Sequence, residues 1–293
     1  MPTKNGNGAQ KRRRDRSASA TSKPKTPPPA ENSSASGSSS EALRKLYSSL
    51  LRCRLVQECV RDTSTAAEAQ YDIRIGREAV TVGATGDLAD GDTIAAGPRN
   101  LAALIARGAP PTALLAHASE TNHTASGFAP GLPEDPFNLG TGVALAHKLE
   151  QKRRVVVAFC AQEKPPLQVW HDALAFAAAH RLPIIFVIEN GVSGDGLPCG
   201  EAPHLEAFSF FARDYGFPGI IVDGSDVVAV WRVAQEAVHR ARNGSGPTLI
   251  DCRTDGPRDP LAHLEHYLRK RQTWDDGWKK QVELSIRSEI QRP

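Results

Sequence analysis

The stretch that decides the fold runs from Arg153 to Gly191 and reads RRVVVAFCAQEKPPLQVWHDALAFAAAHRLPIIFVIENG. It contains two short apolar runs, Val155–Cys160 and Ile184–Ile188, without the polar alternation of a strand that has one face in water. Such runs are typical of parallel strands that are covered on both faces. The segment between them, residues 167–180, is long enough for a crossover helix. We therefore predict a βαβ unit within an α/β fold, a mainly parallel sheet with helices on both faces.

The same alternation of helices and strands continues on both sides of this unit. Before it, apolar residues recur at helical spacing from Leu43 to Val56, after a possible N-cap at Ser38-Ser39-Ser40. After it, Gly219–Val222 and Thr248–Cys252 are typical of two more strands. The residue pattern predicts strands at 93–95, 155–160, 184–188, 219–222 and 248–252. It predicts helices at 41–61, 78–88, 101–107, 138–146, 167–180, 227–242 and 259–271, and a further helix that begins with residues 113–117.

Residues 1–40 differ from the rest, because they are mainly Ser, Pro, Lys and Ala with almost no large apolar side chain. Such a segment cannot bury enough apolar surface to order itself, so we expect a disordered arm followed by one domain, residues 41–293. The arm has eight Lys or Arg and two Asp or Glu, a net charge of +6; the whole chain has +3, which leaves −3 for the domain. Residues 11–16 could contact nucleic acid, an anionic membrane or another acidic partner, but no aromatic residue offers base stacking. A solvated tail is the simpler interpretation.

Composition excludes several classes of protein. With 293 residues and 40% hydrophobic content, the chain can bury a sizeable core. It has no run of about 18 or more apolar residues and no signal-peptide pattern, so we expect a cytoplasmic protein without a membrane span. Its five cysteines lack any CxxC or Cys/His spacing, which indicates reduced thiols and neither disulfides nor zinc.

Polar residues follow both strands of the central unit where each strand ends. Ala161-Gln162-Glu163 comes after the first strand, and Glu189-Asn190-Gly191 comes after the second. Open α/β sheets bind ligands at the carboxyl ends of their strands, so these two tripeptides are the candidate site.

The string VVVAFC…HDALAFAAAHRLPIIFVIENG resembles the cofactor segment of the alpha subunit of 2-oxoacid dehydrogenase E1 components, of the thiamine-diphosphate-dependent pyruvate and branched-chain type. The resemblance covers roughly residues 41–290 and includes the strings Tyr71–Ala79 and Phe217–Asp226. It implies the thiamine-diphosphate-binding fold, with thiamine diphosphate and Mg²⁺ as cofactors. It also implies a beta-type partner subunit, or self-association, and a lipoyl-bearing E2 complex.

In that family the first strand ends in Gly-Asp-Gly and the second in Asn-Asn, and the Asp and the second Asn hold the Mg²⁺ that clamps the cofactor's diphosphate. This chain has Ala161-Gln162-Glu163 at the first place and the single Asn190 at the second. The resemblance thus assigns Gln162 and Asn190 to the metal, with Glu163 and Arg99 as further cofactor contacts. A neutral amide removes ligand charge, and a Cβ in place of Gly hinders the approach of the diphosphate.

Further departures concern other residues that reach the cofactor. Asp72 stands where the family has a His, and Pro98 replaces an aromatic residue before Arg99. After the strand 248–252 the family has a mobile loop with a catalytic His; here Arg258 takes the place of that His and the loop is absent. The resemblance therefore assigns no catalytic residue.

His263 and His266 lie on the helix that follows, three residues apart. Two histidines alone do not make a metal site, so we interpret both as surface or packing residues.

The leading hypothesis is an E1-alpha-like subunit with a catalytically impaired site and a structural or regulatory role. The alternative is an active oxidoreductase that decarboxylates a 2-oxoacid and acylates a lipoyl domain, with Gln162, Glu163 and Asn190 as an altered metal set. A third hypothesis is an adaptor that binds nucleic acid or membrane through residues 11–16. The sequence does not identify the 2-oxoacid or the beta partner.

Overall fold

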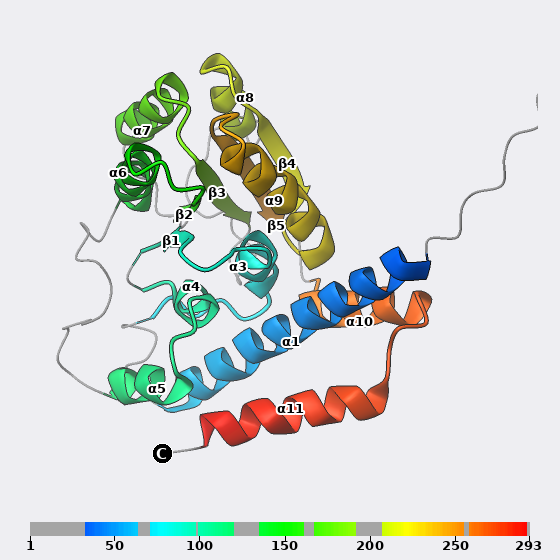
Figure 1. The fold of residues 1–293 in the computed structure, drawn as a ribbon. Helices are drawn as coiled ribbons and strands as arrows, with labels where there is room; N and C mark the ends of the chain where they lie inside the picture. The colour runs from blue at the N-terminus through cyan, green and yellow to red at the C-terminus, as the bar shows by residue number, and fades with distance from the viewer. Residues whose placement is uncertain are drawn as a thin grey trace, which may run out of the picture.

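A computed structural model describes residues 33–63, 71–97, 99–119, 135–160, 167–191, 207–254 and 258–291. At its centre lies a five-stranded sheet with the order β1-β2-β3-β5-β4, in which every neighbouring pair is parallel (Figure 1). The predicted α/β fold is confirmed. The strands are β1 (Thr93–Ala95), β2 (Val156–Cys160), β3 (Ile184–Gly191), β4 (Gly219–Asp223) and β5 (Thr248–Thr254).

The lack of polar alternation in β2 has a direct structural cause. Val157 and Phe159 belong to an apolar cluster on one face of the sheet, whereas Val156 and Ala158 belong to a second cluster on the other face. Strand β3 lies beside β2 with Val156 opposite Ile184. Because both faces of these strands are covered by helices, every side chain of β2 is buried.

Helices cover both faces of the sheet, and a further group lies outside them. Helices α3 and α9 supply Val80 and Val230 to the first apolar cluster, and α6 and α7 supply Phe137 and Leu174 to the second, where Ala212 of α8 joins them. The helices are α1 (Ser33–Thr63), α3 (Glu78–Thr85), α4 (Leu101–Ala106), α5 (Pro111–Ser119), α6 (Pro136–Leu149), α7 (Leu167–Ala179), α8 (Ala207–Asp214), α9 (Val227–Arg242), α10 (Pro260–Lys270) and α11 (Asp276–Ile290).

Helix α1 is the centre of a third apolar cluster. Leu50 of α1, Leu101 of α4 and Leu264 of α10 are completely buried in it, and Leu114 of α5 and Ile286 of α11 complete it. In Figure 1 the long α1 lies between α11 and the helices that cover the sheet. None of the helices in the described part of the chain is long and apolar enough to cross a membrane.

Helix α1 begins at Ser33 and not at the predicted residue 41. Residues 33–40 contain no proline, whereas Pro27-Pro28-Pro29 lie just before them. A helix that is anchored by buried leucines can extend through small residues until proline interrupts it. The rest of the arm for which we predict disorder, residues 1–32, lies outside the described residues.

Aspartate caps explain where α6 and α11 begin. The Asp135 carboxylate accepts from Asn138 N at 3.0 Å, so α6 begins at Pro136 and not at residue 138. The Asp275 carboxylate accepts from Gly277 N at 2.7 Å and starts α11, a helix that the sequence analysis did not predict. An aspartate at the N-cap satisfies backbone N–H groups of the first turn that have no partner within the helix.

Two helical glycines offer a matched test of the packing. A Cβ at Gly83 of α3 would lie 2.8 Å from the Val230 Cβ of α9, whereas a Cβ at Gly142 of α6 would meet nothing within 4 Å. We expect Gly142→Ala to raise the free energy of unfolding by about 0.5–1 kcal/mol, the usual gain of Ala over Gly in a helix. Gly83→Ala should lower it, since overpacking typically costs about 1–3 kcal/mol. Urea denaturation measures both, and equal stabilisation by the two changes would contradict this α3–α9 contact.

Candidate functional site

The carboxyl ends of the parallel strands lie at one edge of the sheet, as in other open α/β sheets. In the β3–β5 register Glu189 lies beside Cys252, and Asn190 lies beside Arg253. Cys160, the last residue of β2, lies beside Ile188. The structure thus places Glu189 and Asn190 next to the end of β2, where the sequence analysis expects them.

Glu189 is a buried carboxylate at this edge, with 8% of its side chain exposed. Its Oε2 accepts from Arg74 Nη1 at 2.7 Å, and its Oε1 accepts from Thr81 Oγ1 at 3.3 Å. Burial raises the pKa of Glu189, and the nearby guanidinium of Arg74 opposes that shift. Arg74 Nε also donates to Asp72 Oδ2 at 2.7 Å, so one guanidinium joins two carboxylates.

Helix α1 and the start of α3 hold Arg74 in place. The Arg74 N–H donates to Oε1 of the fully buried Gln57 of α1 at 2.9 Å. Two residues further on, Gly76 has φ +90°, a conformation that favours glycine, and its N–H donates to the Glu78 carboxylate at 3.0 Å. The turn that presents Arg74 to β3 is therefore fixed by side chains on both neighbouring helices.

A second ion-pair group ties α1, α3 and α10 together. Arg54 Nε donates to Glu78 Oε1 at 2.6 Å, and Arg54 Nη2 donates to Asp259 Oδ1 at 2.7 Å. Asp259 is also the N-cap of α10, where it accepts from Leu261 N at 3.3 Å. The Glu78 side chain has no exposed surface and that of Arg54 has 13%, so this pair lies in a low-dielectric environment.

Asn190 pairs across the strands with Asp251. Its Nδ2 donates to Asp251 Oδ1 at 3.2 Å, and Asp251 Oδ2 accepts from Arg253 Nε at 3.4 Å. Asn190 is 8% exposed, and Asp251 is completely buried. The Asn190 amide thus makes a structural hydrogen bond between β3 and β5.

The remaining predicted site residues lie at different distances from this group. Arg99 is exposed, and its carbonyl accepts from Asp72 N at 2.7 Å, so its backbone borders the Asp72–Arg74 turn. Gln162 and Glu163 lie outside the described residues. The roles of Arg99, Gln162, Glu163 and Asn190 as cofactor residues remain predictions.

Residues near the place of the family's catalytic loop make surface contacts. Arg258 forms an ion pair with Asp223 of β4, in which both side chains are well exposed. His263 Nε2 lies 3.5 Å from Asp226 Oδ2, and His266 is exposed. This arrangement agrees with our interpretation of both histidines as surface or packing residues.

Cys53, Cys160 and Cys252 are buried thiols. Burial raises the pKa of Cys160 to about 12, and burial also raises the pKa of Cys53 and Cys252 well above the ordinary value. Because the thiolate is the reactive form, these side chains act as small apolar groups.

The described donors at this edge do not fit a Mg²⁺ ion. Mg²⁺ requires several hard oxygen ligands in an octahedral array. Here the Asn190 amide and the Arg253 guanidinium bind the Asp251 carboxylate, and the Arg74 guanidinium binds the Glu189 carboxylate. Within the described part of the chain, no group of three or more His, Cys, Asp or Glu side chains could hold a metal ion.

Comparison with known proteins decides the family. The family described as Dehydrogenase E1 component matches residues 54–255. The alpha subunit of acetoin:2,6-dichlorophenolindophenol oxidoreductase from Bacillus subtilis is 34% identical over 196 residues, which cover 61% of this chain and 59% of that protein. The alpha subunit of 3-methyl-2-oxobutanoate dehydrogenase from Mycobacterium tuberculosis is 30% identical over 284 residues, which cover 85% of this chain and 77% of that protein.

This chain belongs to the dehydrogenase E1 component family. The resemblance inferred from the sequence is therefore confirmed. The chain spans 59% of the Bacillus subtilis relative, so similarity over this length establishes the family and leaves the substrate and the partners of the whole protein open.

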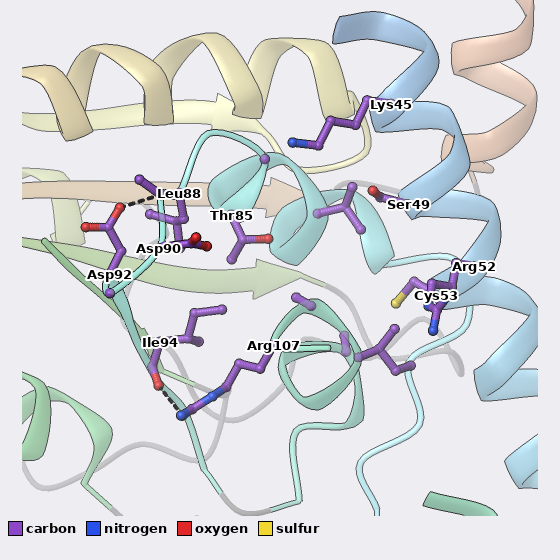
Figure 2. A pocket seen from close by; sticks show the side chains of 17 residues that line it. Lys45, Ser49, Arg52, Cys53, Thr85, Leu88, Asp90, Asp92, Ile94 and Arg107 are labelled. Carbon is purple, nitrogen blue, oxygen red and sulfur yellow. Dashed lines mark hydrogen bonds between the residues drawn. The ribbon is translucent and has the colours of Figure 1, made fainter. Parts of the chain in front are cut away.

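The E1-type domain also has a cavity of about 470 Å³, bounded by α1, α3 and α4 (Figure 2). Lys45, Arg52 and Asp92 line it, but none of the predicted site residues does. Arg52 forms an ion pair with Glu289, and Asp92 accepts from Val155 N at 2.9 Å. Most charged groups around this cavity therefore serve the packing of the E1-type fold.

Sequence reasoning missed the role of Arg74, which organises the carboxyl edge. Arg74 and Glu189 lie 115 residues apart, and no spacing rule connects them. The available signal was the pair of charged residues Asp72 and Arg74 in the string that resembles the family, together with a Glu at the end of β3.

The Arg54–Glu78 pair provides a test of the edge in this E1-type chain. Arg54→Met would leave the Glu78 carboxylate buried without its cation, and we expect a loss of about 3–5 kcal/mol in the free energy of unfolding. The matched control is Arg287→Met, which breaks the exposed i,i+4 pair with Glu283 and should cause no measurable change. Urea denaturation of both variants gives the comparison. Equal small effects would show that Arg54 does not hold Glu78 as the structure indicates.

Proposed function

We propose that this chain is an alpha-type subunit of a 2-oxoacid dehydrogenase E1 component that keeps the family scaffold and has an impaired cofactor site. In this proposal it serves as a structural or regulatory partner of a beta-type subunit. The observation that carries the proposal is that the polar groups at the carboxyl edge already bind one another, with Arg74 between Asp72 and Glu189.

The charge balance at the carboxyl edge supports this proposal. A diphosphate needs a metal ion beside it to offset its negative charge, and the protein must fix that ion with oxygen ligands. The described edge offers carboxylates that are neutralised by arginines, and the Asn190 amide is bonded to Asp251. Ligand binding at this edge would have to disrupt buried ion pairs, which is costly.

The length of the loop after β5 supports impairment independently. Strand β5 ends at Thr254, and α10 begins at Pro260 with Asp259 as its N-cap. Residues 255–259 are too few for the mobile, His-bearing loop that the family resemblance implies, and Arg258 pairs with Asp223. A general acid or base must come within hydrogen-bonding reach of the reacting group, and this segment contains no His for that role.

The partners follow from the relatives. The Bacillus subtilis and Mycobacterium tuberculosis relatives are alpha subunits by name, so we propose a beta-type chain or a second copy of this chain as the direct partner. A lipoyl-bearing E2 complex and an acidic partner for the basic residues 11–16 are further candidates. Purification of the chain with its co-eluting proteins tests these partners.

The active-enzyme alternative depends on Gln162, Glu163 and Asn190 as an altered metal set, of which Gln162 and Glu163 follow Ala161 after the end of β2. A carboxylate at Glu163 could replace the missing Asp if it reached a metal ion. If it did not, it would repel the diphosphate.

Calorimetric measurement of cofactor binding distinguishes the impaired subunit from the active enzyme. We expect no binding of thiamine diphosphate with Mg²⁺ at concentrations that saturate an active alpha–beta enzyme of the family, with or without a beta partner. Gln162→Asp combined with Glu163→Gly should not restore activity, because the His-bearing loop is also absent. Tight Mg²⁺-dependent binding by the unmodified chain, lost in Glu163→Ala, would establish the active-enzyme alternative instead.

A further inference from the structure

The turn before α3 and the end of β3 are joined by a single guanidinium. Arg74 binds Asp72 through Nε and Nη2, and it binds Glu189 of β3 through Nη1. The exposed fractions of the three side chains are 18% for Arg74, 34% for Asp72 and 8% for Glu189. The bridge therefore becomes more buried toward the strand end, where a charge without a partner would cost most.

The surroundings of Glu189 leave Arg74 as its principal counter-ion. Thr81 of α3 contributes a neutral hydroxyl at 3.3 Å, and Arg77, the residue before α3, adds a further positive charge. Cys252 lies beside Glu189 in the register with β5. Apart from Arg74, no cation in the described part of the chain contacts the Glu189 carboxylate directly.

We propose that Arg74 acts as an internal counter-ion that takes the place of a metal ion at this edge. Its ion pair with Glu189 holds the segment 71–78 against β3. The guanidinium neutralises Glu189, and Asp72 fixes the guanidinium in turn. The edge thus keeps its folded arrangement with no divalent cation bound. This inference deepens the proposed function, because it names the contact that closes the cofactor edge.

The planar guanidinium suits this role better than an ammonium group would. It presents N–H groups in a rigid planar fork. Its Nε and Nη2 donate to Asp72 Oδ2, while Nη1 donates to Glu189 Oε2. A lysine is a point charge on a flexible chain and cannot make both contacts with fixed geometry. Arg74→Lys should therefore keep the positive charge but lose most of the stabilisation that comes from contacting Asp72 and Glu189 together.

A double-mutant cycle on the full chain tests the proposal without any thiamine diphosphate. The variants are Arg74→Met, Glu189→Gln and the combination of the two, and urea denaturation gives the unfolding equilibrium constant of each. We expect each single change to favour unfolding, and the double variant to be more stable than the sum of the two effects by about tenfold in that constant. The same cycle on the exposed pair Arg287 and Glu283, with the corresponding Met and Gln changes, is the control and should show no coupling.

A second measurement addresses the metal. The unfolding midpoint of the unmodified chain should be the same in saturating Mg²⁺ and in a chelator, because the counter-ion is part of the chain. A midpoint that rises with Mg²⁺ alone, or effects of Arg74→Met and Glu189→Gln that simply add, would overturn the proposal.

If Arg74→Met does not fold, the double variant shows whether Arg74 is the counter-ion of Glu189. A folded double variant supports the proposal, since removal of the buried Glu189 charge then restores folding. An unfolded double variant overturns the proposal. These outcomes do not depend on the cofactor. Thiamine diphosphate could bind and disprove the proposed function while the coupling between Arg74 and Glu189 remains.

Discussion

A carboxylate buried at the end of a parallel strand must have a cation beside it, and this requirement shapes the carboxyl edge of the protein. Glu189 and Glu78 are both almost completely buried. Each is satisfied by an arginine that belongs to another element, Arg74 from the turn before α3 and Arg54 from α1. An unpaired charge in these positions would cost several kcal/mol, of the same order as the net stability of a domain. The position of α1 and the turn against the sheet is therefore set by charge as well as by apolar contact.

Helix α1 connects the two kinds of constraint. Its apolar side chains, such as Leu50, form the cluster that α10 and α11 cover. Its polar side chains, Arg54 and Gln57, hold Glu78 and the backbone of Arg74. The family match ends at residue 255, yet Asp259 of α10 completes the Arg54 group beyond that limit. The helices that follow the matched region thus stabilise the edge that lies within it.

The fold could be predicted from the sequence because its determinants are local. Residues 155–160 are apolar throughout since both faces of β2 are covered, and a pattern of this kind can be read without knowing the partners. The site was predictable only as a location, the ends of β2 and β3. The Arg74–Glu189 contact joins residues 115 positions apart, and the Asn190–Asp251 bond joins residues 61 positions apart. Neither pairing follows from propensity or spacing, because the fold alone brings these side chains together.

The core and the carboxyl edge of this chain constrain substitution in different ways. A substitution in β2 disturbs two apolar clusters at once, because neighbouring residues such as Val156 and Val157 pack on opposite faces. A substitution at the edge requires only that charges stay balanced and hydrogen bonds stay satisfied. An arginine opposite Glu189 meets that requirement from within the chain, whereas a metal ion must be supplied from solution. In the arrangement that we propose, the arginine would keep the edge stable without a bound ligand, and the edge would then tolerate changes at residues that serve only a ligand.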